Sequence, residues 1–180
     1  MLFIVILLSS GKCFPLPVIV FQKLISKQTK ANIFTAHFRQ MTLNGTKTGL
    51  FIFLAEDDID DQELLIEALS NLDNTIIIHT ANNGKKAVHY LEQLAASQAP
   101  QLIILDFNLP ELSGADILKH LHSISHFNDV PKIVWSTSNS PVYEKQCLDL
   151  GAKAYVVKPS DVSGIDEFAK FVLKMCTVKK

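Results

Sequence analysis

Five short apolar runs, each followed by a segment with the apolar spacing of an amphipathic helix, constrain the fold of this chain most strongly. The run at 101–105 is rich in Leu and Ile and is bounded by Pro100 and by Leu109–Pro110. This pattern is typical of a strand buried on both faces of a parallel sheet. The predicted strands are 50–55, 75–80, 102–106, 132–136 and 154–157. Strands that alternate with helices through short loops predict an α/β fold with helices on both faces of the sheet.

The helices between these strands carry their own boundary signals. Asp60 followed by Glu63 has the spacing of a capping box, so the first helix is predicted to begin at Asp60. Its predicted apolar face is Leu64, Leu65, Ala68, Leu69 and Leu72. The other helices are expected after the turn at 82–84, at 114–122, between Pro141 and Leu150 with Gly151 as the residue that ends it, and around Ile165, Phe168, Ala169, Val172 and Met175.

Composition limits the classes of function. The chain has 180 residues, of which 48% are hydrophobic, enough for one domain with a sizeable core and an appendage. The formal net charge is -1, so no nucleic-acid partner is indicated. The three cysteines, Cys13, Cys147 and Cys176, are odd in number and widely spaced, which favours neither disulfides nor zinc. We therefore expect a cytoplasmic protein.

The first 48 residues differ from the rest and are interpreted as an N-terminal extension, with the folded domain at 49–180. The apolar runs at 2–8 and 14–21 fall short of the ~18 residues that a spanning helix needs. No positive charge precedes the first run, so it is a weak secretory signal. The favoured hypothesis is that the biological start is Met41, and the alternative is a membrane anchor. No membrane contact is expected for 49–180.

Charged side chains follow three of the predicted strands. Glu56-Asp57-Asp58 comes after the first strand, Asp106 ends the third, and Lys158-Pro159 follows the fifth. In open α/β sheets, ligands bind beyond the carboxyl ends of the strands. Two acidic ends and one basic end therefore suggest a site for a metal ion and a phosphoryl group. Asp58, Asp60 and Asp61 are expected to be solvated or capping residues rather than ligands.

Residues 50–176 resemble the receiver domain of bacterial two-component response regulators, of the stand-alone, single-domain type. The motifs that carry this resemblance are Leu54-Ala55-Glu56-Asp57-Asp58, Leu105-Asp106-Phe107-Asn108-Leu109-Pro110 with Gly114, Val134-Trp135-Ser136-Thr137-Ser138 and Tyr155-Val156-Val157-Lys158-Pro159. Each stands at the end of a predicted strand, and all four occur in the family's order. The resemblance implies a flavodoxin-like, doubly wound parallel sheet of five strands in the order 2-1-3-4-5, with five helices.

The resemblance also implies a metal site and a phosphoacceptor. Asp106 matches the aspartate that accepts a phosphoryl group from a phosphohistidine. Asp57 would bind Mg²⁺ directly, and Glu56 would act mainly through water. Asn108 would contribute its backbone carbonyl. The implied partners are a histidine kinase or phosphotransfer protein and a downstream protein target.

Three further matches concern the response to phosphorylation. Lys158 matches the lysine that pairs with the phosphoryl oxygens, and Ser136 matches the switch hydroxyl. Tyr155 matches the aromatic residue that turns inward on activation. The step from Lys158 to Pro159 matches a cis peptide bond in the family.

Other functions remain open at this point. A haloacid-dehalogenase-like phosphatase also uses an aspartate nucleophile, but it wants a second Asp where this chain has Asn108. A degenerate receiver could act as a binding scaffold without phosphorylation, which the intact Asp106, Asp57 and Lys158 disfavour. Flavodoxin itself would need a phosphate-binding loop after the first strand. Only residues 159–180 follow Lys158, room for one helix, so the expected output is protein–protein contact rather than metabolic catalysis.

Overall fold

The computed structural model describes residues 3–7, 13–17 and 49–177. The chain divides into two units, Met1–Thr48 and Gly49–Lys180. In the first unit, β1 (Phe3–Leu7) pairs antiparallel with β2 (Cys13–Pro17). The hypothesis about Met41 falls outside the described residues. No helix in the described part of the chain is long and apolar enough to cross a bilayer.

The second unit is built on a parallel sheet of five strands. In chain order these are β3 (Phe51–Ala55), β4 (Ile77–Ala81), β5 (Leu102–Asp106), β6 (Lys132–Ser136) and β7 (Ala154–Val157). Their order across the sheet is β4-β3-β5-β6-β7, so the order 2-1-3-4-5 is confirmed. The short apolar runs form the three central strands of the sheet, and every residue of β3, β5 and β6 is buried.

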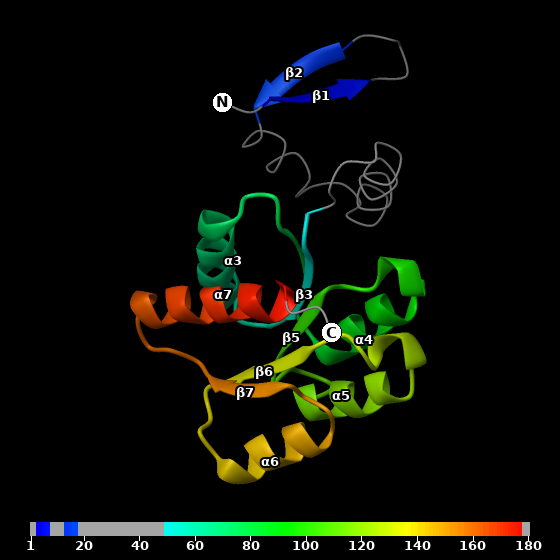
Figure 1. Cartoon of the computed structure of the whole chain (residues 1–180), viewed down its shortest axis with the longest axis vertical. Helices are drawn as coiled ribbons and strands as arrows, with labels where there is room; N and C mark the ends of the chain where they lie inside the picture. Colours follow the sequence, from blue (N-terminus) through cyan, green and yellow to red (C-terminus); the bar gives the residue numbers. More distant parts are fainter. Residues whose placement is uncertain (1–2, 8–12, 18–48, 178–180) are drawn as a thin grey trace. The chain divides into compact units, whose positions relative to one another are not determined.

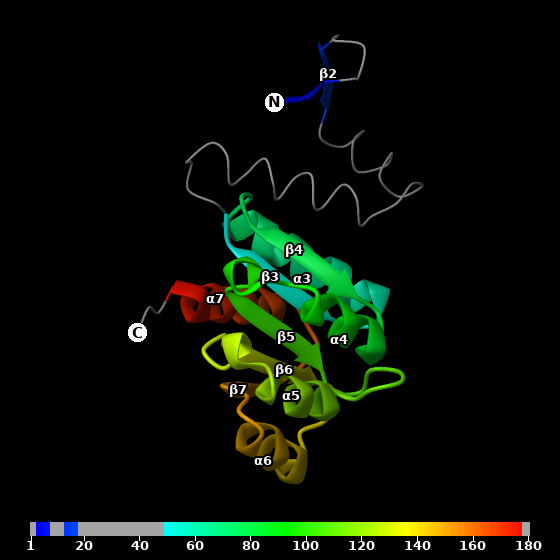
Figure 2. The same ribbon diagram turned by 90° about the vertical axis from the view of Figure 1, so that its right-hand side faces the viewer.

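Five helices connect and follow these strands, as expected. They are α3 (Ile59–Leu72), α4 (Gly84–Glu92), α5 (Gly114–His122), α6 (Pro141–Asp149) and α7 (Val162–Thr177). Two short 3₁₀ turns, η1 (Ala96–Gln98) and η2 (Ser125–Phe127), lie in the loops. Figures 1 and 2 show α3 and α7 together on one face of the sheet and α4 and α5 on the other.

Alternation along each strand divides the buried side chains between the two faces. On the α3 and α7 face, Ile52 and Leu54 of β3 pack with Ile104 of β5 and Trp135 of β6. The Trp135 ring stacks on Phe168 of α7, with ring centroids 5.2 Å apart. On the other face, Phe53 stacks with Tyr90 of α4 at 5.5 Å. Both faces of the sheet are therefore covered, which holds the strand ends in fixed positions.

Local hydrogen bonds correct two predicted boundaries. Asp58, not Asp60, caps α3, because the Asp58 side chain accepts from the backbone N–H groups of Asp60 and Asp61 at 2.9 and 3.2 Å. The prediction that Asp60 caps the helix is wrong, and Leu64 and Leu72 of its predicted apolar face are exposed. The second strand begins two residues late, at Ile77, because Asp73 accepts from the backbone N–H and hydroxyl of Thr75 in a turn.

Candidate functional site at the carboxyl edge of the sheet

Three central strands deliver polar side chains to one edge of the sheet. Glu56 follows the last residue of β3, Asp106 is the last residue of β5, and Ser136 is the last residue of β6. All three are buried: Asp106 is 4% exposed and the other two are fully covered. Neighbouring strands run parallel and in register, with Asp106 beside Trp135, so their carboxyl ends meet here.

The loop after β5 is packed tightly under Asp106. Gly114 donates its N–H to the carbonyl of Phe107 at 3.1 Å. A Cβ at Gly114 would lie 2.5 Å from the backbone oxygen of Asp106, closer than any side chain tolerates, so only glycine fits this approach. The Asn108 N–H donates to Asp106 Oδ2 at 3.2 Å. Backbone groups of Asn108 and Gly114 therefore contact Asp106 on two sides.

Three carboxyl groups form an acidic cluster at this edge. Glu56, Asp57 and Asp106 each offer one oxygen, and these oxygens all lie within 4.8 Å of one another. Glu56 and Asp106 are buried, whereas Asp57 is exposed. Oxygen donors of this kind, with one side open to solvent, suit a hard divalent cation that keeps several waters.

Burial and mutual repulsion control the charge of this cluster. Burial raises the pKa of Glu56 to about 7; the charge of Asp106 adds to this effect, and Lys158 opposes it. Burial likewise raises the pKa of Asp106, with Asp57 adding to the increase and Lys158 counteracting it. Ionising Glu56 and Asp106 together is therefore costly, and Lys158 offsets only part of that cost.

Lys158 supplies a positive charge from the loop after β7. Its Nζ lies 2.7 Å from Glu56 Oε2, 2.8 Å from Asp61 Oδ2 and 3.6 Å from Asp106 Oδ1. The backbone N–H of Lys158 donates to the carbonyl of Ser136 at 2.7 Å, which extends the β6–β7 pairing to the site. Burial alone would lower the pKa of Lys158, but the hydrogen bonds to Asp61 and Glu56 outweigh burial and raise it.

Asp61 is the site residue that the sequence analysis missed. It was expected to be solvated or capping, yet it is an ion-pair partner of Lys158 and is only partly exposed. The two residues are 97 positions apart, and no motif links them. The available signal was weak: an acidic residue on the first turn of the helix that follows the Glu56-Asp57 pair.

The two predicted switch residues both contact the loop between β6 and α6. Ser136 Oγ accepts from the N–H of Ser138 at 3.1 Å. The half-buried Tyr155 donates its hydroxyl to the carbonyl of Ser138 at 2.8 Å, and its ring meets that of Phe107 edge-on at 6.4 Å. The expected cis bond before Pro159 is wrong, because the described residues contain no cis peptide bond.

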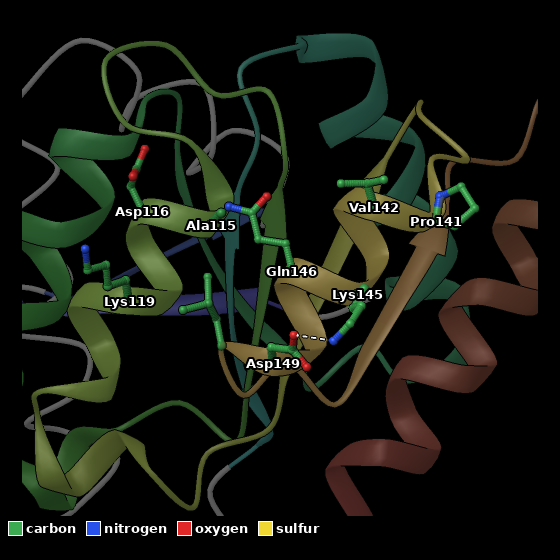
Figure 3. A pocket seen from close by; sticks show the side chains of 9 residues that line it. Ala115, Asp116, Lys119, Pro141, Val142, Lys145, Gln146 and Asp149 are labelled. Carbon is green, nitrogen blue, oxygen red and sulfur yellow. Dashed lines mark hydrogen bonds and ion pairs between the residues drawn. The ribbon is translucent and has the colours of Figure 1, made fainter.

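A separate open groove of about 860 Å³ lies between α5 and α6. Figure 3 shows its charged side chains, including Lys119 and the Lys145–Asp149 ion pair, whose atoms are 2.7 Å apart. Its lining includes neither Asp106 nor Lys158. The groove is therefore separate from the acidic cluster of Glu56, Asp57 and Asp106.

Comparisons with known proteins agree with this geometry. Residues 52–170 match the response regulator receiver domain model. The chain is 30% identical over 115 residues to the two-component response regulator ORR3 of Oryza sativa subsp. indica, covering 62% of this chain and 84% of that protein. It is 26% identical over 133 residues to ARR17 of Arabidopsis thaliana, covering 69% and 86%.

A solved structure shows the same fold. The phosphorylated cyanobacterial phytochrome response regulator RcpA superposes with a TM-score of 0.65 at 30% identity, covering 73% of this chain and 99% of that one. The sheet order, the motifs at the strand ends and the family match agree with one another. The chain therefore belongs to the response regulator receiver family, whose members act in two-component phosphorelay systems.

Proposed function

We propose that Asp106 accepts a phosphoryl group from the phosphohistidine of a histidine kinase or phosphotransfer protein, with Mg²⁺ bound, and that this changes the affinity for a downstream protein. One observation carries the proposal: a buried carboxylate, Asp106, has an oxygen within 4.8 Å of two other carboxyl oxygens and 3.6 Å from the ammonium of Lys158. The 30%-identical RcpA, solved in its phosphorylated form, supports it.

The chemistry suits this arrangement. An Asp106 oxygen attacks phosphorus, an O–P bond forms, the P–N bond of the phosphohistidine breaks, and the imidazole nitrogen keeps the electron pair. Little covalent work falls to other residues, because phosphoryl transfer is catalysed mainly by positioning and by neutralising charge. Lys158 is placed to neutralise phosphoryl oxygens from one side. The Asn108 N–H orients the carboxylate by donating to Asp106 Oδ2.

The residues present fit Mg²⁺. Glu56, Asp57 and Asp106 supply oxygen donors, and the backbone carbonyl of Asn108 would complete the protein ligands, with Glu56 acting mainly through water. Burial raises the pKa of Glu56 and of Asp106 more than Lys158 lowers it, so a bound cation would make ionisation of both groups less costly. When bound, the ion would keep Asp106 ionised and screen the incoming phosphoryl charge.

The alternatives are less well supported. A haloacid-dehalogenase-like phosphatase needs an acid two residues after its nucleophile, and the Asn108 amide has no acidic proton to give. Burying charged groups costs free energy of desolvation. A scaffold that works without phosphorylation would not need to place Asp106, Glu56 and Lys158 together away from water. We accordingly propose a relay without metabolic catalysis and without a nucleic-acid partner. A reducing cytoplasmic location is supported by the free thiols of Cys147 and Cys176.

We also propose that Ser136, Lys158 and Tyr155 transmit the change. A phosphoryl group adds acceptor oxygens beside Ser136, whose hydroxyl would leave the Ser138 N–H to donate to them. Since Tyr155 is bonded to the carbonyl of Ser138, movement of this loop would release its ring to turn inward. The surface formed by α6, β7 and α7 would then shift between two packings.

The test is labelling with acetyl phosphate, with and without EDTA. The parent should be phosphorylated only with Mg²⁺, and Asp106→Asn should not be labelled. In amide spectra, beryllofluoride, a stable substitute for a phosphoryl group on aspartate, should move signals of α6 and β7. Ser136→Ala should still bind it with smaller shifts, and Lys158→Ala should blunt them further. Labelling of Asp106→Asn at the parent level would refute the assignment.

A further inference from the structure

The ammonium of Lys158 is bound mainly by groups other than the phosphoacceptor. Its Nζ donates a hydrogen bond to Asp61 Oδ2 at 2.8 Å and forms an ion pair with Glu56 Oε2 at 2.7 Å. The distance to Asp106 Oδ1, 3.6 Å, exceeds that of a hydrogen bond. Lys158, which is expected to bind the phosphoryl group, therefore lies next to Asp106 but is paired with Glu56 and Asp61.

The position of Asp61 is fixed by the first turn of α3. Its backbone N–H is bonded to the Asp58 cap at 3.2 Å. The next residue, the buried Gln62, donates its side-chain Nε2 to the backbone carbonyl of Glu56 at 2.6 Å. These bonds fasten the turn over the end of β3. The backbone of Asp61 consequently cannot move with Lys158 toward Asp106 without breaking the cap or the Gln62 bond.

We propose that Asp61 is a positioning residue that competes with the phosphoryl group for Lys158 and so opposes activation. This rests on the proposed function of Asp106. A phosphoryl group brings a charge of about -2 to the site. To bond with it, the Nζ of Lys158 must give up some of its contact with Asp61. This competition for Lys158 favours the unphosphorylated state.

Asp60 provides a matched control. It carries the same charge one residue earlier on the same turn, but its side chain is exposed, and the ion pairs of Lys158 are with Glu56, Asp61 and Asp106. Asp60→Asn and Asp61→Asn therefore remove equal formal charge from the same region. A difference in beryllofluoride affinity between the two variants therefore reports the contact of Asp61 with Lys158, and not the removal of one negative charge near the site.

The experiment is a beryllofluoride titration at saturating Mg²⁺. Trp135 is the single tryptophan of the chain, and Lys158 Nζ lies 4.9 Å from its ring centroid, so its fluorescence reports on this cation. Asp61→Asn should bind beryllofluoride about fivefold more tightly than the parent, the effect of an ion pair of about 1 kcal/mol. Asp60→Asn should stay within about twofold of the parent. In a Lys158→Gln background, Asp61→Asn should have no effect beyond that of Asp60→Asn.

Each contrary outcome has one meaning. If the parent binds beryllofluoride but Asp61→Asn matches Asp60→Asn or binds more weakly, Asp61 does not compete, and the inference is overturned while the proposed function stands. Tighter binding that persists in the Lys158→Gln background would overturn it too, since the effect would not pass through Lys158. If the parent binds no beryllofluoride, the proposed function fails and this inference with it.

Discussion

Asp57 and Asp58 are adjacent acidic residues with different surroundings. An oxygen of Asp57 belongs to the cluster with Glu56 and Asp106, whereas the Asp58 side chain caps α3. Both are exposed, so burial does not distinguish them. Their different contacts predict that one substitution affects metal binding and the other affects stability.

Removing Asp57 should weaken Mg²⁺ binding, because the cluster loses a charged oxygen ligand. We expect Asp57→Ala to lower the affinity by more than about tenfold, which even the loss of an outer-shell partner can cost. Asp58→Ala should leave the affinity within about twofold, yet lower the free energy of unfolding by about 1 kcal/mol through the lost cap. Trp135 fluorescence during metal titration and urea unfolding measure the two effects. Equal losses of metal affinity would show that the assignment of Asp57 as the ligand is wrong.

At the scale of elements, the start of α5 lies beside Asp106, the proposed phosphoacceptor. Ser113 and Asp116 form a capping box: the Ser113 hydroxyl and backbone N–H donate to Asp116 Oδ2 at 2.6 and 3.0 Å. In return, the Asp116 N–H donates to Ser113 Oγ at 3.2 Å. Because Gly114 lies against the backbone of Asp106, this cap also orients the loop that follows Asp106.

The cap makes a pH-dependent contribution to stability. The hydrogen bonds from Ser113 lower the pKa of Asp116 below its ordinary value of 3.8. A carboxyl group with a lowered pKa in the folded state stabilises the fold above its ordinary pKa, and this stabilisation is lost as pH falls through the folded pKa. We therefore expect Ser113→Ala to cost about 1 kcal/mol at neutral pH, and less in acid.

Urea unfolding of the parent and of Ser113→Ala, at neutral pH and at about pH 3, measures this change. The matched control is the same pair of proteins carrying Asp116→Asn, whose side chain does not ionise. In that background the cost of Ser113→Ala should not vary with pH. A cost that is constant with pH in the presence of Asp116 would contradict the prediction.

At the scale of the whole molecule, the proposed site lies within residues 49–180. The core of buried residues on the α3 and α7 face runs from Ile52 to Val172 and is contributed by β3 to α7. The same segment contains Glu56, Asp106 and Lys158. This arrangement supports the interpretation of 1–48 as an extension that the folded domain does not need.

A chain that begins at Met41 should accordingly unfold cooperatively, with the same midpoint as the full chain, and should bind beryllofluoride equally well. Thermal unfolding and the Trp135 titration measure both properties. A chain that begins at Leu54 is the control, because it lacks most of β3 and should not fold. Insolubility of the Met41 chain, with the full chain soluble, would instead favour a structural or anchoring role for the first 40 residues.

The sequence by itself determined the elements and the acidic edge of the site. Apolar runs and helical spacing are local properties, so the strand Ala154–Val157 and the helix Gly114–His122 agree with their predicted bounds. The carboxyl ends of adjacent parallel strands must meet, so Glu56, Asp57 and Asp106 were expected to lie close together. The strand order followed from the family resemblance, because alternation indicates a parallel sheet without giving its order.

Only the tertiary structure decided which acidic residue caps α3 and which acidic residues pair with Lys158. Whether Asp60 or Asp58 capped α3 depended on the backbone geometry of the turn, which composition does not specify. The pairing of Asp61 with Lys158 required the first turn of α3 and the loop after β7 to meet over the end of β3. A contact between residues 97 positions apart arises only once α3 is packed on the sheet and β7 is paired with β6. Sequence patterns report local preference and burial, whereas such distant contacts depend on the whole fold.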